Sequence, residues 1–311
     1  MRAFIFPGQG SQAVGMGTEL AQASTTAREL FQEVDDALGQ NLFRVMAEGP
    51  ADQLTLTENA QPAIMANALA TLRVAEREAG LTIADKAQFV AGHSLGEYTA
   101  LAAAEALDVA TTARLLKLRG QAMQAAVPVG QGAMAALIGV ELADAQSIAA
   151  EAAEGEVCVA ANDNAPGQVV VSGHRGAVER AIAVAKGRGF RRALLLPVSA
   201  PFHSPLMEPA ARAMEEALAG ADLRPPVVPV YANVIAAPAE EPAEIRRLLV
   251  DQVTGMVRWR ESILAMTEAG VTHFVEWGGK VLAPMVKRIA PDANAVSIVT
   301  MDDIEALMKE I

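Results

Sequence analysis

The sequence has 311 residues, of which 52% are hydrophobic and 20% are charged. It can therefore bury a core, and global disorder is excluded. Its 25 Lys and Arg residues stand against 37 Asp and Glu, a formal net charge of −12, which disfavours a general nucleic-acid binder. No stretch has the composition of a membrane helix or a signal peptide. The single cysteine, Cys158, excludes an intramolecular disulfide framework and a Cys-rich zinc site. We expect a soluble, cytoplasmic and monomeric protein without a nucleic-acid or membrane partner.

The first part of the chain alternates between strand and helix patterns. Apolar runs predict strands at residues 2–6 and 88–92. Amphipathic patterns predict helices near 18–38, 60–79, 93–107 and 108–126. This alternation predicts an α/β fold, similar to that of α/β-hydrolases, with a largely parallel sheet.

A more compact series of short elements follows Pro128. The patterns predict strands at 133–140, 157–161, 168–172 and 192–196, helices at 143–153 and 176–186, and a turn at 162–167. The order β-α-β-β-α-β is that of the ferredoxin-like unit. We therefore predict a small ferredoxin-like domain at 129–198, inserted into a large catalytic domain made of 1–128 and 199–311. Beyond it we expect a loop at 199–205, a helix near 206–218, and loops at 224–229 and 236–242.

The strongest local motif is Gly92-His93-Ser94-Leu95-Gly96, a G-x-S-x-G pattern between an apolar strand and a helix. That context is typical of a nucleophile elbow, in which small glycines flank a sharp turn. Ser94 would be held at a helix N-terminus, where backbone N–H groups can stabilise an oxyanion. The alternative is a glycine-rich turn that carries an ordinary serine.

A serine nucleophile needs a base, and the sequence contains four histidines. His93 adjoins Ser94, and adjacent residues in a sharp turn usually point apart. We expect His174 to be a solvated residue at the start of a helix and His273 to be a satisfied strand residue. His203 follows a predicted strand in a loop, where catalytic groups often lie. It is the preferred base by elimination, although a structural histidine stays possible.

Several motifs occur together in one order along the chain: FPGQGSQ at 6–12, GHSLGEY at 92–98, LRG at 118–120 and PFHSPLM at 201–207. QVVVSG at 168–173, VRW at 257–259 and GKVL at 279–282 extend the pattern. Together they resemble the malonyl-CoA:acyl-carrier-protein transacylase family of fatty acid synthesis, over residues 4 to about 290.

The resemblance implies a role for each matching residue. Ser94 would carry the acyl group and His203 would be its general base. The backbone N–H groups of Gln9 and Leu95 would form the oxyanion hole, and Arg119 would hold the malonyl carboxylate. The carbonyl of Gln252 would orient the histidine, so that no acidic third residue is needed. Without the resemblance, Arg119 would be interpreted as a solvated helix residue, and Asp251 as a surface carboxylate.

Further roles rest on the same resemblance. Phe202 matches the malonyl-selecting form of its loop, and Asn162 and Asn164 match a turn near the substrate entrance. The pattern is broken at Ile235, Met256 and residues 277–279, which puts fine selectivity and carrier docking in question. Basic clusters that could dock an acidic carrier protein contain Lys287 and Arg288, and Arg191 and Arg192.

The sequence thus predicts an acyltransferase that moves malonyl from coenzyme A to the phosphopantetheine thiol of acyl carrier protein, in a ping-pong reaction through acyl-Ser94. Coenzyme A is a substrate, and no metal or redox cofactor is implied. A serine hydrolase or thioesterase with the same elbow is one alternative, and a non-catalytic scaffold is another. The same transfer could also serve a polyketide or malonate-decarboxylase system.

Overall fold

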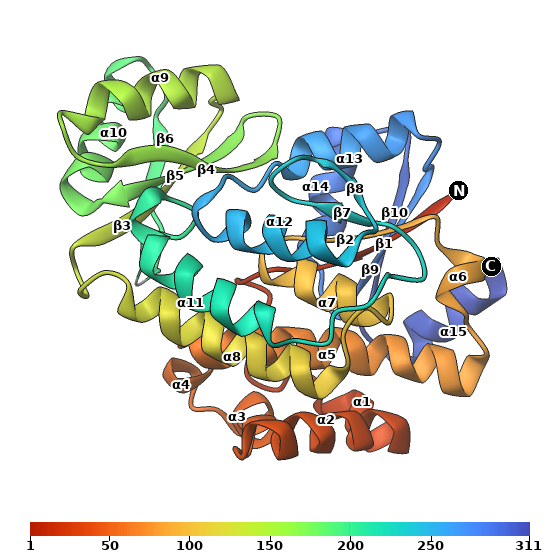
Figure 1. Cartoon of the computed structure of the whole chain (residues 1–311). Coiled ribbons are helices and arrows are strands. Elements are labelled where there is room, and N and C mark those ends of the chain that lie inside the picture. Colours follow the sequence, from red (N-terminus) through yellow and green to blue (C-terminus); the bar gives the residue numbers. More distant parts are fainter. Residues whose placement is uncertain (199) are drawn as a thin grey trace.

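The computed structural model describes residues 1–198 and 200–311, whose strands form two sheets (Figure 1). The larger sheet has the strand order β10-β9-β1-β2-β7-β8. All its pairs are parallel except that of β7 with β8. Its strands are β1 (Arg2–Phe6), β2 (Phe89–Gly92), β7 (Val230–Ala232), β8 (Ala237–Ala239), β9 (His273–Trp277) and β10 (Asn294–Ile298).

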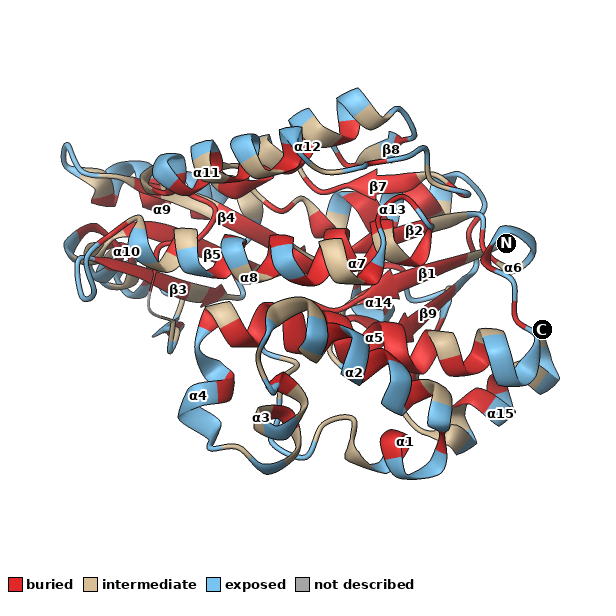
Figure 2. Cartoon of the chain, turned by 60° about the horizontal axis from the view of Figure 1, so that its bottom comes forward, coloured by how far each residue is buried: buried red, intermediate tan, exposed pale blue. Residues whose placement is uncertain are grey.

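Helices cover both faces of this sheet, which explains why its strands are apolar on both sides. Phe4 and Phe6 of β1 pack into one hydrophobic core, whereas Ala3 and Ile5 pack into a second. The first core contains side chains of α2 (Thr25–Leu38), α5 (Thr57–Ala79), α7 (Leu95–Ala103), α8 (Val109–Ala125), α11 (Glu208–Ala219) and α12 (Pro242–Thr254). The second contains side chains of α13 (Trp259–Glu268) and α14 (Leu282–Ile289). Figure 2 shows the buried strands between these layers.

Shorter elements complete this part of the chain. They are α1 (Thr18–Ala23), α3 (Leu42–Glu48), α4 (Ala51–Thr55), α6 (Ile83–Lys86), a 3-10 helix at Pro205–Met207 and α15 (Met301–Glu310). None of the described helices combines the length and apolarity needed to cross a membrane.

The smaller, antiparallel sheet lies to one side of the larger one (Figure 1). In chain order this unit contains β3 (Gly132–Ile138), α9 (Leu142–Ala153), β4 (Cys158–Ala165), β5 (Gln168–His174), α10 (Arg175–Gly187) and β6 (Arg192–Leu195). Its strand order is β4-β5-β3-β6. Leu137 and Val171 pack against α9 and α10, whereas Met134 and Val170 belong to the core of the large unit. The second face of the small sheet is thus turned toward the large unit.

Ion pairs, backbone pairing and hydrogen bonds tie the two units together. Arg260 of α13 forms ion pairs with Asp163 of β4, at 2.9 Å, and with Glu141 before α9, at 2.7 Å. Asn162 forms an isolated parallel bridge with Val257. Arg288 of α14 donates hydrogen bonds to the Gln168 side chain and the Pro166 carbonyl, in the hairpin between β4 and β5.

Most predicted elements are present, and four predictions of their extent are wrong. The segment 18–38 is two helices, because Ser24 lies in an extended conformation and caps α2 through the Ala27 N–H. The helix predicted to reach 107 ends at Ala103, and Glu105 has a positive φ of 61°. Residues 162–165 of the turn predicted at 162–167 are instead the end of β4, and β8 lies in the predicted loop 236–242. In both of these places pairing with a neighbouring strand outweighs the local turn composition. Residue 199, at the predicted domain boundary, lies outside the described residues.

Candidate active site

Ser94 lies in a strained turn between β2 and α7. Its φ of 53° and ψ of −110° are unusual for a residue with a side chain. Glycine is required on both sides of the turn: a Cβ on Gly92 would overlap the Gly96 carbonyl, and a Cβ on Gly96 would overlap the carbonyl oxygen of Phe6. The close passage of these backbones holds Ser94 at the start of a helix, as the sequence motif predicts.

Ser94 and His203 form a hydrogen-bonded pair, in which Oγ lies 2.8 Å from Nε2. His203 Nδ1 lies 2.9 Å from the Gln252 carbonyl oxygen and 3.1 Å from that of Gly255. Carbonyl oxygens only accept, so Nδ1 carries the proton and Nε2 is free to accept the proton of Ser94. Burial, and then the positive charge of Arg119, lower the pKa of His203 to about 3. The imidazole is therefore neutral near pH 7, as a general base must be.

Arg119 of α8 points into the same place and has only 1% of its surface exposed. Its guanidinium donates to Gln61 Oε1 and Gln252 Oε1, both at 2.8 Å, and to Ser94 Oγ at 3.1 Å. Its Nε has no hydrogen-bond partner among the described residues, and the carboxyl group of Glu97 acts on it through space. Burial lowers its pKa. The interpretation of Arg119 as a solvated helix residue is wrong, and the guanidinium is available to an acidic ligand.

A cavity of about 320 Å³ opens over this pair, between the two sheets. Gln9, Leu95, Arg119, Ser94 and His203 line it. Leu95 is the first residue of α7, and the N–H of such a residue has no intrahelical acceptor. The apolar wall comes from both units and consists of Met123, Met134, Val170, Leu196, Val198 and Phe202. A cavity with an apolar wall and polar groups gathered around one point is typical for a small-molecule ligand.

Asn162 and Asn164 also line the cavity, from the end of β4 rather than from a turn. Asn164 Oδ1 lies 2.7 Å from Nε2 of His93, which is half-buried beside Trp259. The Nε2 atom of His93 is thus engaged by Asn164, whereas the Ser94 hydroxyl is bonded to His203. The other two histidines do not line the cavity. His174 Nδ1 accepts the Val157 N–H, and His273 is exposed on β9.

Two residues for which the sequence predicted no role, Asn233 and Glu97, stabilise the Ser94 turn on the side away from the cavity. Asn233 Oδ1 accepts the Ser94 N–H at 2.8 Å, and its Nδ2 donates to the Gly92 carbonyl at 2.7 Å. Glu97 is 2% exposed and accepts hydrogen bonds from Asn233 and Gln252. The sequence does contain one sign of this role. Glu97 is an acidic residue within the apolar helix sequence LGEYTAL, and a buried carboxylate must have hydrogen-bond partners.

The predicted docking residues lie outside the cavity lining. Lys287, Arg191 and Arg192 are exposed, and Arg288 is held by the β4–β5 hairpin. Asp251 forms an ion pair with Arg247 and is partly exposed, in agreement with its interpretation as a surface carboxylate.

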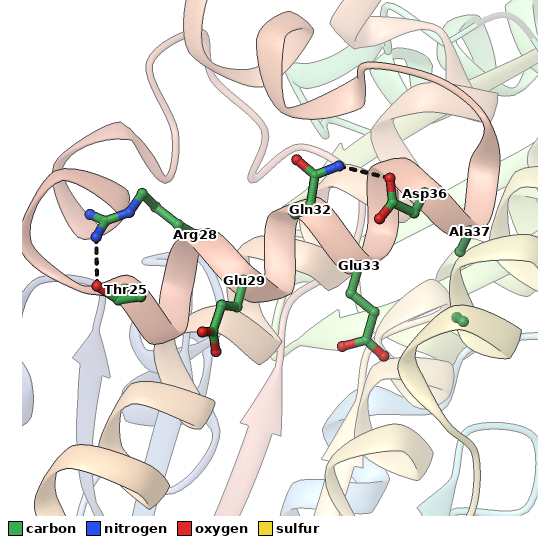
Figure 3. Close-up of a pocket in the computed structure, with 8 residues that line it drawn as sticks. Thr25, Arg28, Glu29, Gln32, Glu33, Asp36 and Ala37 are labelled. Carbon is green, nitrogen blue, oxygen red and sulfur yellow. Dashed lines mark hydrogen bonds between the residues drawn. The ribbon is translucent and has the colours of Figure 1, made fainter.

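A second hollow, on α2, is larger but has no comparable chemistry. It has a volume of about 700 Å³, and its polar side chains bond to one another, as in Thr25 with Arg28 and Gln32 with Asp36 (Figure 3). Within the described part of the chain, no three His, Cys, Asp or Glu residues are grouped to hold a metal ion.

Comparison with known proteins agrees with this geometry. The family model described as "Acyl transferase domain" matches residues 3–280. The malonyl CoA-acyl carrier protein transacylase of Escherichia coli (strain K12) is 44% identical, over 95% of each chain. A crystal structure of an acyl-carrier-protein-S-malonyltransferase from Bartonella henselae is 52% identical, with a TM-score of 0.97, and covers 99% of this chain and 98% of that one. A second structure, PlMCAT:AntF, is a malonyl-transacylase in complex with a type II PKS acyl-carrier protein. It is 38% identical, with a TM-score of 0.96, over 100% of this chain and 99% of the other.

Proposed function

This chain belongs to the acyl transferase family, and on that premise we infer that it transfers a malonyl group from coenzyme A to the phosphopantetheine thiol of acyl carrier protein. This reaction supplies fatty acid synthesis. The observation that supports it most directly is the arrangement around Ser94 Oγ, with a neutral base on one side and a buried guanidinium on the other.

In the first half-reaction, Ser94 Oγ attacks the thioester carbon while its proton passes to His203 Nε2. The carbonyl oxygen becomes an oxyanion, for which the backbone N–H groups of Gln9 and Leu95 are the proposed donors. Collapse of this intermediate breaks the carbon–sulfur bond. The leaving thiolate takes the proton from His203, and malonyl-Ser94 and coenzyme A are formed.

The second half-reaction reverses these steps with a different thiol. The phosphopantetheine thiol gives its proton to His203, and its sulfur attacks the ester carbon. Ser94 then leaves and recovers the proton. We propose that the Gln252 carbonyl keeps a proton on His203 Nδ1 in both half-reactions. This carbonyl would take the place of the acidic third residue of a catalytic triad.

Arg119 is the proposed partner of the malonyl carboxylate. A bidentate guanidinium offsets most of the cost of burying that charge. Its distance of 3.1 Å from the nucleophile matches a carboxylate one methylene away from the attacked carbon. Phe202, Asn162 and Asn164 are proposed to shape the rest of the acyl and pantetheine site.

The finer structural assignments are also proposals. The small unit at 129–198 is proposed to be a ferredoxin-like domain, a view supported by its element order and by its strand order β4-β5-β3-β6. The remainder, 1–128 and 199–311, would be one α/β-hydrolase-like domain. A cytoplasmic location, a monomeric state, and the absence of a metal, a redox cofactor and a nucleic-acid partner stay predictions.

Intact-mass spectrometry tests the reaction. Mixing with malonyl-CoA should add one malonyl group, which peptide mapping should place on Ser94, and acyl carrier protein should then remove it. Labelling of Ser94→Ala to the same extent would refute the assignment. Loss of the label to water without any thiol would favour a hydrolase.

A second candidate function differs in the carrier protein that accepts the malonyl group. The PlMCAT:AntF complex contains a type II PKS carrier protein, so transfer to a polyketide carrier is the alternative use of the same chemistry. A comparison of kcat/KM for fatty acid and polyketide carrier proteins would distinguish the two pathways.

A further inference from the structure

Glu97 is a buried carboxylate that the proposed mechanism leaves without a role. It lies in the first turn of α7, three residues after Ser94, and is 2% exposed. Its neighbours Leu95, Tyr98 and Leu101 are buried as well. A carboxyl group in such surroundings is costly unless it is well bonded, so its partners show what it does.

Glu97 Oε2 accepts two hydrogen bonds, each of 2.9 Å. One comes from the backbone N–H of Asn233, and the other from the side-chain amide nitrogen of Gln252. Asn233 in turn spans the Ser94 turn, with bonds to the Ser94 N–H and the Gly92 carbonyl. Glu97 Oε2 therefore bonds to both Asn233 and Gln252, the two residues whose side chains contact the backbone of the Ser94 turn.

The Gln252 amide has only one orientation that satisfies all its neighbours. Its Oε1 accepts from Arg119 at 2.8 Å, and its Nε2 donates to Glu97 at 2.9 Å and to the Ser94 carbonyl at 3.1 Å. A flipped amide would place its NH2 group against the guanidinium, which only donates, and its oxygen against two acceptors. Glu97, which accepts the shorter of the two bonds from Nε2, therefore acts with the Ser94 carbonyl to keep the amide oxygen facing Arg119.

We propose that Glu97 is a positioning residue for acyl selection: by fixing the Gln252 amide, it holds the Arg119 guanidinium where the acyl carboxylate binds. This inference rests on the proposed function. It assigns to Glu97 a role in distinguishing malonyl from acetyl thioesters, rather than in the proton transfers, because the Gln252 group that contacts His203 is the backbone carbonyl and not the amide.

The experiment measures kcat and KM for malonyl-CoA and acetyl-CoA in Glu97→Met and Glu97→Gln. The methionine removes the acceptor of the Asn233 N–H and of one Gln252 amide N–H. It should lower the malonyl-to-acetyl ratio of kcat/KM by about tenfold, because the Gln252 amide then keeps only its bond to the Ser94 carbonyl and a contact with Asn233. The glutamine keeps one acceptor oxygen and should restore the ratio to within about threefold. An unchanged ratio in folded Glu97→Met would overturn the proposal.

Glu276→Gln is the matched control. Glu276 is also fully buried, but its carboxylate accepts the N–H groups of Val281, Leu282 and Ala283 at the start of α14. This variant should lower the Tm and leave the malonyl-to-acetyl ratio unchanged. A similar fall of the ratio in this control would show that loss of stability alone explains the effect, and would also overturn the proposal.

Gln252→Met tests whether Glu97 acts on Arg119 through the Gln252 amide. It removes the amide and keeps the carbonyl to His203, so it should reproduce the fall in ratio, and adding Glu97→Met should lower the ratio little further. Independent, additive losses would show that Glu97 does not act through Gln252.

If Glu97→Met does not fold, Glu97→Asp takes its place, because it keeps a carboxyl group and withdraws it by one methylene. The ratio should again fall, and failure of both variants to fold would make Glu97 a stability residue and overturn the proposal. Failure of the proposed function is distinguishable, because the wild-type protein would then not be malonylated at all.

Discussion

The Arg119 guanidinium gives up its hydration to lie beside the Ser94 hydroxyl, with only neutral side-chain oxygens as acceptors. In the proposed function, a substrate carboxylate would bind this guanidinium and would itself be spared the cost of burial without a partner. On that proposal, Arg119 would select for an acidic acyl group.

Arg119→Ala should lower kcat/KM for malonyl transfer by about 10² or more, because a hydrogen-bonded buried charge pair is worth several kcal/mol when one partner is removed. Acetyl transfer should improve relative to malonyl. Steady-state kinetics with both thioesters measure the ratio, and an unchanged ratio would mean that another group binds the carboxylate.

His203 should remain neutral well below the usual range of histidine, because burial and Arg119 lower its pKa from 6.5 to about 3. The native state then binds fewer protons than the unfolded state between these values, so this histidine's contribution to stability is lost as the pH falls from 6.5 toward 3. Ring-labelled histidine NMR, assigned with His203→Gln, should show no titration between pH 8 and 5. A midpoint near 6.5 would contradict the structure.

At the scale of elements, the backbone of the turn between β2 and α7 is packed very closely against the backbone that follows β1. Gly96 faces the carbonyl oxygens of Phe6 and Pro7, and a Cβ on Gly8 would lie 2.7 Å from the His93 carbonyl oxygen. The N-terminal loop that contains Gln9 is therefore packed directly against the turn that carries Ser94.

Gly96→Ala should destabilise the protein by about 1–3 kcal/mol, the usual cost of overpacking, and slow acylation of Ser94. Gly187→Ala is the matched control, because a Cβ there meets nothing within 4 Å. That variant should be neutral or slightly stabilising. Urea denaturation and single-turnover acylation measure the two effects, and equal stabilities of the two variants would argue against the tight turn.

At the scale of the whole molecule, the net charge of −12 opposes an acidic carrier protein, so docking needs a local basic surface. Lys287 is exposed on α14, next to Arg288, which holds the β4–β5 hairpin. Substitution of Arg288 would therefore disturb the contact between the two units as well as the surface charge. Lys287 alone is the cleaner test of docking.

Lys287→Glu should slow transfer from malonyl-Ser94 to acyl carrier protein by roughly tenfold at low salt, with little effect at high salt. Transfer to free pantetheine should be nearly unchanged. Arg44→Glu, on α3 at the opposite side of the large unit (Figure 1), is the control with the same change of charge. Equal losses with both thiols would show damage to the site, and no loss with either would remove Lys287 from the docking surface.

The amino-acid sequence by itself determined the strand–turn–helix around Ser94 and the alternation of elements. These depend on local rules: glycines where a Cβ would clash, and apolar periods that match a buried strand or helix. It also separated His203 from the other three histidines. The family motifs then added Arg119 and Gln252, which no local pattern distinguished from surface residues.

Only the tertiary structure decided which polar groups meet in the interior. Arg119 and Gln252 lie 133 positions apart in the chain, and Ser94 and Asn233 lie 139 apart. Strand pairing likewise extended β4 through a segment whose composition predicts a turn, and it placed Asn164 against His93. Burial and hydrogen-bond partners arise from the packing of distant segments, whereas the sequence periodicity records only which face of each element is apolar. For that reason the reaction could be predicted from motifs, but the network of Glu97, Gln252 and Asn233 behind the nucleophile could not.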